Sequence, residues 1–217
     1  MGALLSSFSE EGIDEYMCSP DESWPMVVLD DSKVPKTFRI KDVSPMLDSE
    51  GSTSGRVAKE LIRHACESRG IEADITVPSS TCVNVALNEI LESFHEDSIQ
   101  CLRVPKDEKK IMQCICSGYP VSAVIPVTDE ILEKVVTLPA KESDTFAMLP
   151  VVLWGYSSVS KKFAGVVPLS VYDEPVAISF SQVMSDDSCD FYVINVREYD
   201  DGSQNEDSAE DVALFCD

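Results

Sequence analysis

The spacing of apolar residues changes once along this chain, near Gly118, and this change constrains the fold more than any other feature of the sequence. Three stretches before it have apolar residues at helical spacing: 57–69, 83–95 and 106–118. Short apolar runs predict strands at 38–40, 71–77, 121–127, 151–154, 163–167 and 191–196. Since the strands concentrate after the helices, we predict an α+β protein with a helical lobe to about Gly118 and a β lobe after it.

A run of small polar residues leads into the first predicted helix. Ser52, Thr53 and Ser54 are all good N-caps, because their side-chain oxygens can accept the N–H groups of the first turn. Gly70 predicts the end of this helix. Exposed N–H groups and the helix dipole also stabilise anions at such a start. The stretch 47–61 is therefore the first candidate for a functional site.

The chain is strongly acidic, and this limits its partners. It carries 39 Asp and Glu against 17 Lys and Arg, a net charge of −22 over 217 residues. Such a surface repels phosphate backbones, so we expect no nucleic-acid partner and favour protein partners with basic surfaces. The sequence has no apolar run of bilayer-spanning length and no visible secretory signal, so we expect an intracellular protein.

The cysteines and histidines do not form a metal motif. The eight cysteines are dispersed without a CxxC pair, and the chain has two histidines. We therefore expect no metal and no cofactor, and reduced thiols packed in the core of an intracellular protein.

The two ends differ from the middle of the chain. Met1 to Ser6 fits the pattern for N-myristoylation at Gly2, and we expect membrane association only if Gly2 is acylated. We predict an extended segment over residues 1–37, with prolines as breakers. Residues 199–217 form an acidic tail without Lys or Arg that ends in an apolar cluster. This tail could dock on a partner or fold back on its own body.

Several short motifs follow one another in an order that one protein family shares. They are Arg103-Val104-Pro105, Gly118-Tyr119-Pro120-Val121, Val136-Thr137-Leu138-Pro139, Val151-Val152-Leu153-Trp154-Gly155-Tyr156 and Ser188-Cys189-Asp190-Phe191-Tyr192-Val193-Ile194. Together they resemble the branch of papain-family cysteine peptidases that occurs in bacteria and large DNA viruses. The resemblance covers about residues 38–196. It implies a papain-like two-lobe domain over 38–198, in which the second lobe is an antiparallel β-barrel-like lobe.

The resemblance also places four functional positions on this sequence. Aligned on the Gln-Gly-x-x-x-x-Cys segment of the family, Glu50 takes the place of the oxyanion-binding Gln and Arg56 that of the nucleophile. Leu149 takes the place of the catalytic His and Val167 that of the Asn that orients it. A thiolate activated by an imidazole is what such a peptidase needs. The resemblance therefore implies a degenerate site in a protein that is not an enzyme, a pseudoprotease, with Glu50 and Arg56 paired.

The function implied by this resemblance is binding. We expect a binding or structural component, either a minor capsid or other virion protein or a protein that contacts the host. Two alternatives stay open at this stage. One is a hydrolase or peptidase that uses a non-standard nucleophile, and the other is a regulator that binds an active peptidase.

Overall fold

The fold is known from a computed structural model, which describes residues 24–27, 29, 33–41, 52–80, 82–93, 99–126, 148–166, 175–185 and 190–196. The helices within these ranges are α2 (Thr53–Ser68), α3 (Val83–Ser93), α4 (Glu108–Cys116) and α6 (Phe180–Val183). The strands are β1 (Thr37–Arg39), β2 (Ile99–Val104), β3 (Val121–Pro126), β4 (Met148–Ser157), β5 (Lys162–Val166), β6 (Val176–Ser179) and β7 (Phe191–Val196).

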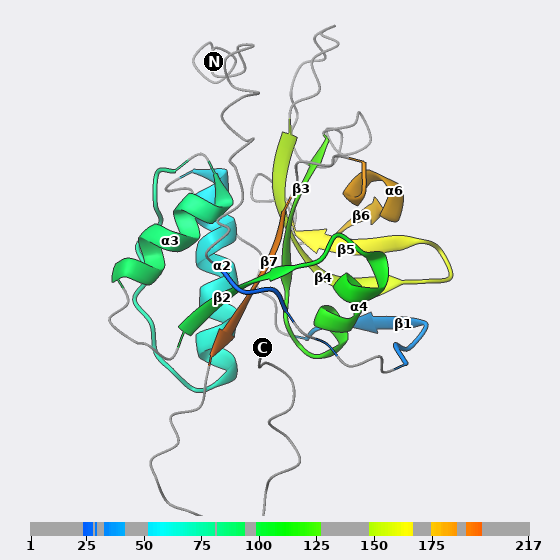
Figure 1. The fold of residues 1–217 in the computed structure, drawn as a ribbon, viewed down its shortest axis with the longest axis horizontal. Helices are drawn as coiled ribbons and strands as arrows, with labels where there is room; N and C mark the ends of the chain where they lie inside the picture. The colour runs from blue at the N-terminus through cyan, green and yellow to red at the C-terminus, as the bar shows by residue number, and fades with distance from the viewer. Residues whose placement is uncertain are drawn as a thin grey trace, which may run out of the picture.

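All seven described strands belong to one antiparallel sheet. Six of them follow the order β2-β7-β3-β4-β5-β6, and β1 pairs with the second half of β4. Figure 1 shows α2 and α3 on one side of this sheet and α4 and α6 on the other. The α+β prediction is therefore confirmed. The division into two lobes near Gly118, the barrel-like form of the second lobe and the boundaries 1–37, 38–198 and 199–217 stay predictions.

Two apolar cores lie on the opposite faces of the sheet. Strand β7 alternates between them: Phe191 and Val193 join the core under α4 and α6, whereas Tyr192 and Ile194 join the core under α2 and α3. All six residues of β7 are buried, as expected for a central strand that is covered on both faces. We call these the α4 core and the α2 core.

Helices α2 and α4 each begin directly after a capping residue. Ser52 caps α2 with its side chain accepting the Gly55 N–H, and Asp107 caps α4 by accepting the Lys110 N–H. Gly118 lies between α4 and β3 and has a φ of +91°, a backbone conformation that favours glycine. This residue therefore ends the α4 segment. These local signals explain why the predicted helices occur close to their predicted places.

Several features differ from the sequence-based expectations, among them strand β6 and helix α6, which were not predicted. Residues 71–77 form no strand; this segment runs back along α2 and contributes Ile75 to the α2 core. Strand β2 was not predicted, and the motif residues Arg103 and Val104 are its last two residues. Cys82 is disulfide-bonded, so the expectation of eight reduced thiols was wrong at this residue. None of the described helices has the length and apolar character that crossing a bilayer requires.

Candidate functional site

The Ser52 hydroxyl links the N-terminal end of α2 to the segment 78–80. Ser52 Oγ accepts the Gly55 N–H at 2.9 Å and donates to the Ser80 carbonyl at 2.5 Å. The Pro78 carbonyl lies near the same hydroxyl, at 3.2 Å. The segment 78–80 is therefore fixed against the first turn of the helix, and Ser80 is fixed in turn by a hydrogen bond from its own hydroxyl to Glu89 on α3.

Gly55 makes this close approach possible. A Cβ atom at this position would lie 2.2 Å from the Pro78 carbonyl oxygen, a distance that real Cβ contacts do not show. The same atom would be 3.0 Å from Ser52 Oγ. A glycine is thus required sterically at the third residue of α2, although its φ is an ordinary helical one.

Thr53 is the residue that opens α2, whereas Arg56 lies one turn further in. The Arg56 N–H donates to the Ser52 carbonyl at 3.0 Å, which is the first regular hydrogen bond of the helix. Arg56 is half-buried. Ser52 is the N-cap and Thr53 the first residue of the helix, so Arg56 lies one turn beyond the helix start.

Leu149 belongs to the core on the other face of the sheet. It pairs with Ile125 across β3 and β4 and is buried in the α4 core. The residue of β4 that joins the α2 core is Val152. The structure therefore places Arg56 and Leu149 on opposite sides of the sheet rather than facing each other.

The remaining predicted site residues fall outside the described ranges. These are Gly2, Glu50 and Val167. The proposed pairing of Glu50 with Arg56 and the acylation of Gly2 stay predictions.

The thiols of Cys114 and Cys116 are not activated. Burial raises the pKa of Cys114 to about 12, and burial also raises the pKa of Cys116. Because the thiolate is the nucleophilic form, both groups are protonated and unreactive near neutral pH. Cys66 and Cys101 are almost completely buried. Nearby on α4, the Cys116 thiol donates to the Gln113 carbonyl at 3.4 Å.

The described histidine has a structural contact. His64 Nε2 lies 3.2 Å from the Gly118 carbonyl, which links α2 to the turn between α4 and β3. Within the described ranges, no three His, Cys, Asp or Glu side chains are grouped so that they could hold a metal ion. His64 therefore supports the packing of two segments in this structure.

A polar cluster at the start of β7 was missed by sequence reasoning. Burial raises the pKa of Asp190, while the charge of Arg103 opposes this rise. Burial and the neighbouring Asp190 also raise the pKa of Tyr192. Arg103 Nε donates to the Trp24 carbonyl at 3.2 Å, and the Trp24 ring meets Tyr192 edge-on at 5.3 Å. The cluster thus fastens residues 24–27 to the edge of β2.

The overall fold resembles that of known peptidases. No protein-family model and no curated protein matches this sequence. Among solved structures, xylellain, a cysteine protease from Xylella fastidiosa, matches with a TM-score of 0.52 at 11% identity, over 85% of this chain and 97% of that one. A Bacillus anthracis protein described as a C39-like peptidase matches with a TM-score of 0.40 at 15% identity, over 79% of this chain and 99% of that one. The similarity to xylellain indicates that the chain has a peptidase-like fold.

This finding corrects one sequence-based prediction. The prediction that the chain is not an enzyme is contradicted, because a solved structure with a similar fold is a cysteine protease. The prediction depended on an alignment of four positions, two of which lie outside the described ranges. The assignment of Glu50, Arg56, Leu149 and Val167 to those positions stays a prediction.

Proposed function

We propose that this chain recognises an extended polypeptide segment of a protein partner at the N-terminal end of α2. One observation carries the proposal: the N-terminal end of α2 is fixed against the segment 78–80 in a fold that a cysteine protease also uses. Proteases act on polypeptide chains, so the fold supports recognition of the same class of ligand. The hydrogen bonds of Ser52 to the segment 78–80 supply a preorganised site, which reduces the entropic cost of binding.

Thr53 is the side chain to test first. It is half-buried and is the first residue of α2. Changing Thr53→Glu adds bulk and charge at the proposed site, while a carboxylate in the first turn is favourable for the helix. Thr37→Glu is the matched control, because Thr37 is an exposed threonine on β1.

The experiment starts from peptides selected on the immobilised full chain from a displayed random library. We expect the selected peptides to bind Thr53→Glu at least tenfold more weakly than the unchanged protein, and Thr37→Glu equally well. Equal affinity of the two variants would refute the location of the site. A library that yields no peptide above background would refute polypeptide recognition itself.

Hydrolysis is the second candidate function. It is favoured by the observation that a hydroxyl-bearing residue, Thr53, opens α2. A hydroxyl nucleophile needs a base that takes its proton. No hydrogen bond joins the Thr53 hydroxyl to a histidine or carboxylate within the described ranges. Mass spectrometry of the selected peptides after incubation separates the two functions, since cleavage that Thr53→Val abolishes would favour hydrolysis.

The setting of this function is proposed from the sequence alone. It favours a virion or host-interaction protein in an intracellular setting, with partner proteins that have basic surfaces. An active peptidase is the other partner class that we propose. Purification of the native protein with its bound partners, followed by mass spectrometry, tests these settings directly, and a partner set without virion proteins would contradict the first of them.

A further inference from the structure

A disulfide bond lies directly beside the proposed peptide site. Cys82 is disulfide-bonded, is only 5% exposed and closely follows the segment 78–80 that is fixed against α2. The other described cysteines are not in disulfides; they are Cys66, Cys101, Cys114 and Cys116. The partner of Cys82 is therefore one of the cysteines outside the described ranges, which are Cys18, Cys189 and Cys216.

The reduced thiols of the same chain indicate that this disulfide depends on its surroundings. Disulfides persist in oxidising compartments, and in reducing compartments they are usually transient or redox-sensing. Cys66, Cys101 and Cys114 are buried as thiols, and Cys116 is a thiol although it is only half-buried. This usage is typical of chains that stay reduced in their compartment. A disulfide at Cys82 in such a chain is therefore expected to form and break with the redox state.

Cys82 lies between the contact with α2 and the start of α3. On the α2 side, the Ser80 carbonyl accepts a hydrogen bond from the Ser52 hydroxyl at 2.5 Å. On the α3 side, the Cys82 carbonyl accepts the Ala86 N–H at 3.0 Å, so Cys82 directly precedes the helix. The disulfide is therefore a covalent attachment of a stretch that hydrogen bonds hold against α2.

The hydrogen bonds to α2 lie where water can compete with them. None of the residues 76–80 is buried, and Ser79 is fully in the exposed class. Hydrogen bonds between neutral groups contribute little net free energy when water can replace either partner. Segments with few buried apolar contacts and accessible hydrogen bonds are the ones that open locally. The contact between this segment and α2 therefore depends on what holds its other end, which is Cys82.

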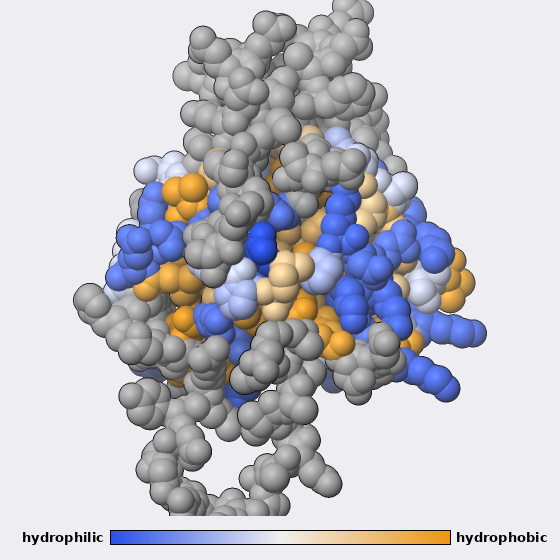
Figure 2. All heavy atoms as spheres, in the orientation of Figure 1, coloured by the Kyte–Doolittle hydropathy of each residue, from blue (hydrophilic) through white to orange (hydrophobic). Residues whose placement is uncertain are grey.

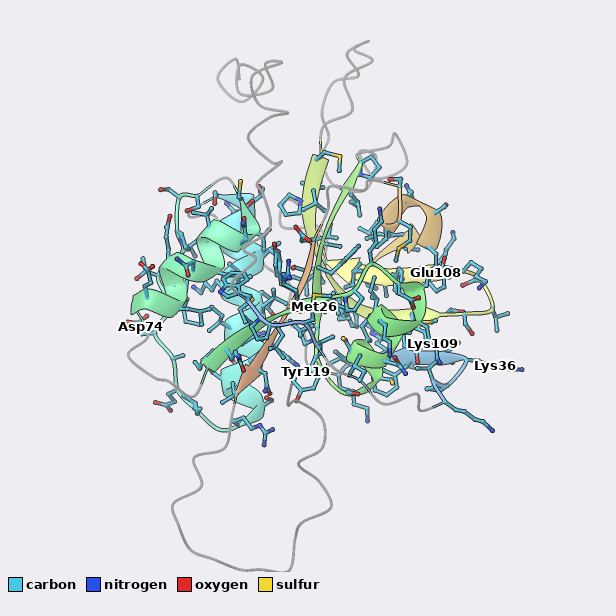
Figure 3. The ribbon with its side chains drawn as sticks, viewed as in Figure 1. Met26, Lys36, Asp74, Glu108, Lys109 and Tyr119 are labelled. Atoms are coloured by element: carbon cyan, nitrogen blue, oxygen red, sulfur yellow. The ribbon has the colours of Figure 1, made fainter. Side chains whose placement is uncertain are left out.

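The connection between α2 and α3 lies apart from the α4 core. Figure 3 places Asp74, in this connection, on the opposite side of the molecule from Lys109 on α4. Ile75 packs in the α2 core, and none of the described residues 71–80 belongs to the α4 core. Figure 2 shows hydrophobic residues among hydrophilic ones on the α2 and α3 side, the mixed character that protein-binding surfaces have. Helix α4 is thus an internal reference for changes near Cys82.

We propose that the Cys82 disulfide is a redox-responsive clip that fixes the segment 78–80 against α2 and so sets the affinity of the peptide site. The inference rests on the proposed function, since the affected contact is the one between Ser52 and Ser80. In the oxidised protein the segment is preorganised, which lowers the entropic cost of binding a peptide. In the reduced protein the segment opens more often, and binding must first order it.

The chemical step is a thiol–disulfide exchange with a small thiol of the glutathione class. A glutathione thiolate attacks one sulfur of the disulfide, a mixed disulfide forms, and the other cysteine leaves as a thiolate that takes up a proton. A second glutathione thiolate then attacks the mixed disulfide and releases the second cysteine thiol. Two glutathione thiols thus supply two electrons and two protons and become one glutathione disulfide. Glutathione disulfide restores the bond by the same steps in reverse.

Hydrogen exchange of the full chain, measured by mass spectrometry in glutathione buffers, tests the clip without a peptide ligand. In excess reduced glutathione we expect the amides of residues 76–82 to exchange at least tenfold faster than in glutathione disulfide. Exchange in α4 should not change. Peptides selected on the oxidised protein should bind the reduced protein at least threefold more weakly. The variant Cys82→Ser should match the reduced protein and should no longer respond to glutathione.

The matched control variant is Cys116→Ser, because it removes a half-buried thiol that is not in a disulfide. It should leave the exchange of residues 76–82 and its response to glutathione unchanged. One further variant should reproduce Cys82→Ser and so identify the partner; the three to compare are Cys18→Ser, Cys189→Ser and Cys216→Ser.

Three results would overturn the clip. They are a bond that glutathione leaves intact in the folded chain, equal exchange of residues 76–82 in both states, and an equal acceleration in α4. Faster exchange without a change in peptide affinity would overturn the link between the clip and the peptide site. Failure of the proposed function itself is recognised separately, by equal binding of Thr53→Glu and Thr37→Glu.

Discussion

Substitution of Gly55 by alanine should have two opposing effects on the free energy of unfolding. In a helix interior, alanine is favoured over glycine by about 1 kcal/mol. At Gly55, however, the new Cβ would lie 2.2 Å from the Pro78 carbonyl oxygen, and ordinary contact begins near 3.4 Å. The segment 78–80 must therefore move away from α2 by more than an ångström, and this movement disrupts the hydrogen bond from Ser52 to Ser80.

The steric effect should win. Overpacking of a well-packed site costs about 1–3 kcal/mol, and loss of an N-cap arrangement costs about 1 kcal/mol. After subtraction of the gain in helix propensity, we expect Gly55→Ala to lower the free energy of unfolding by about 1–3 kcal/mol. The obstacle is a backbone carbonyl, which cannot turn aside as a flexible side chain can.

Urea unfolding of the full chain, followed by circular dichroism, measures this difference. Gly165→Ala is the control, because its new Cβ would meet the end of a side chain, Ile178 Cδ1, at 2.7 Å. A rotamer adjustment there costs up to about 1.5 kcal/mol, so we expect a smaller loss than at Gly55. If Gly55→Ala unfolds at the same or a higher urea concentration than the unchanged protein, the close approach of Pro78 to α2 is refuted.

Three further predictions concern titration, charge and modification. Burial raises the pKa of Cys114 from 9.0 to about 12, so the unfolded chain loses the thiol proton at a lower pH than the folded chain. The free energy of unfolding should therefore fall as the pH rises from 9 towards 12. The urea midpoint should fall less steeply over this pH range for Cys114→Ala than for the unchanged protein. A double-mutant cycle of Glu50→Gln and Arg56→Gln should give a coupling of about 0.2–1 kcal/mol if the two residues pair at the surface, and a coupling of zero would reject the pair. Mass spectrometry of the native protein should find an acyl group on Gly2, and an unmodified mature N-terminus would contradict that prediction.

Local signals in the sequence explain much of the fold. Ser52 and Asp107 cap α2 and α4 where short polar residues precede apolar residues at helical spacing. Strands β3, β5 and β7 agree closely with the predicted apolar runs. These elements could be predicted because capping and hydrophobic period act within a few residues of the chain.

The elements that were missed depend on distant partners. Strand β2 is a strand because it pairs with β7 from Ile99 opposite Val196 to Val104 opposite Phe191. Residues 71–77 have the alternation of a strand, but they pack along α2 without a strand neighbour. Alternation alone does not specify a pairing partner, so neither outcome could be predicted from the local pattern.

At the candidate site too, some features could be predicted from the local sequence and others depend on the tertiary structure. The sequence identified the stretch that leads into α2 as the place to examine, because small capping residues precede an amphipathic helix there. It could not show that Thr53 opens the helix while Arg56 lies one turn inside it. It also could not show that Leu149 faces the α4 core, because the direction of a side chain on β4 depends on the register of its neighbours.

The sequence by itself determined the α+β class, the approximate places of three helices and the total charge of the chain. Each of these follows from residue type and from spacing over a few positions. Only the tertiary structure decided which side chains share a surface. Folding brings β1, α4 and the β4–β5 turn together, so that Lys161 lies near Glu108 and Ser158 bonds to the Lys36 carbonyl. Charges far apart in a sequence act together only when the fold places them within screening distance of one another.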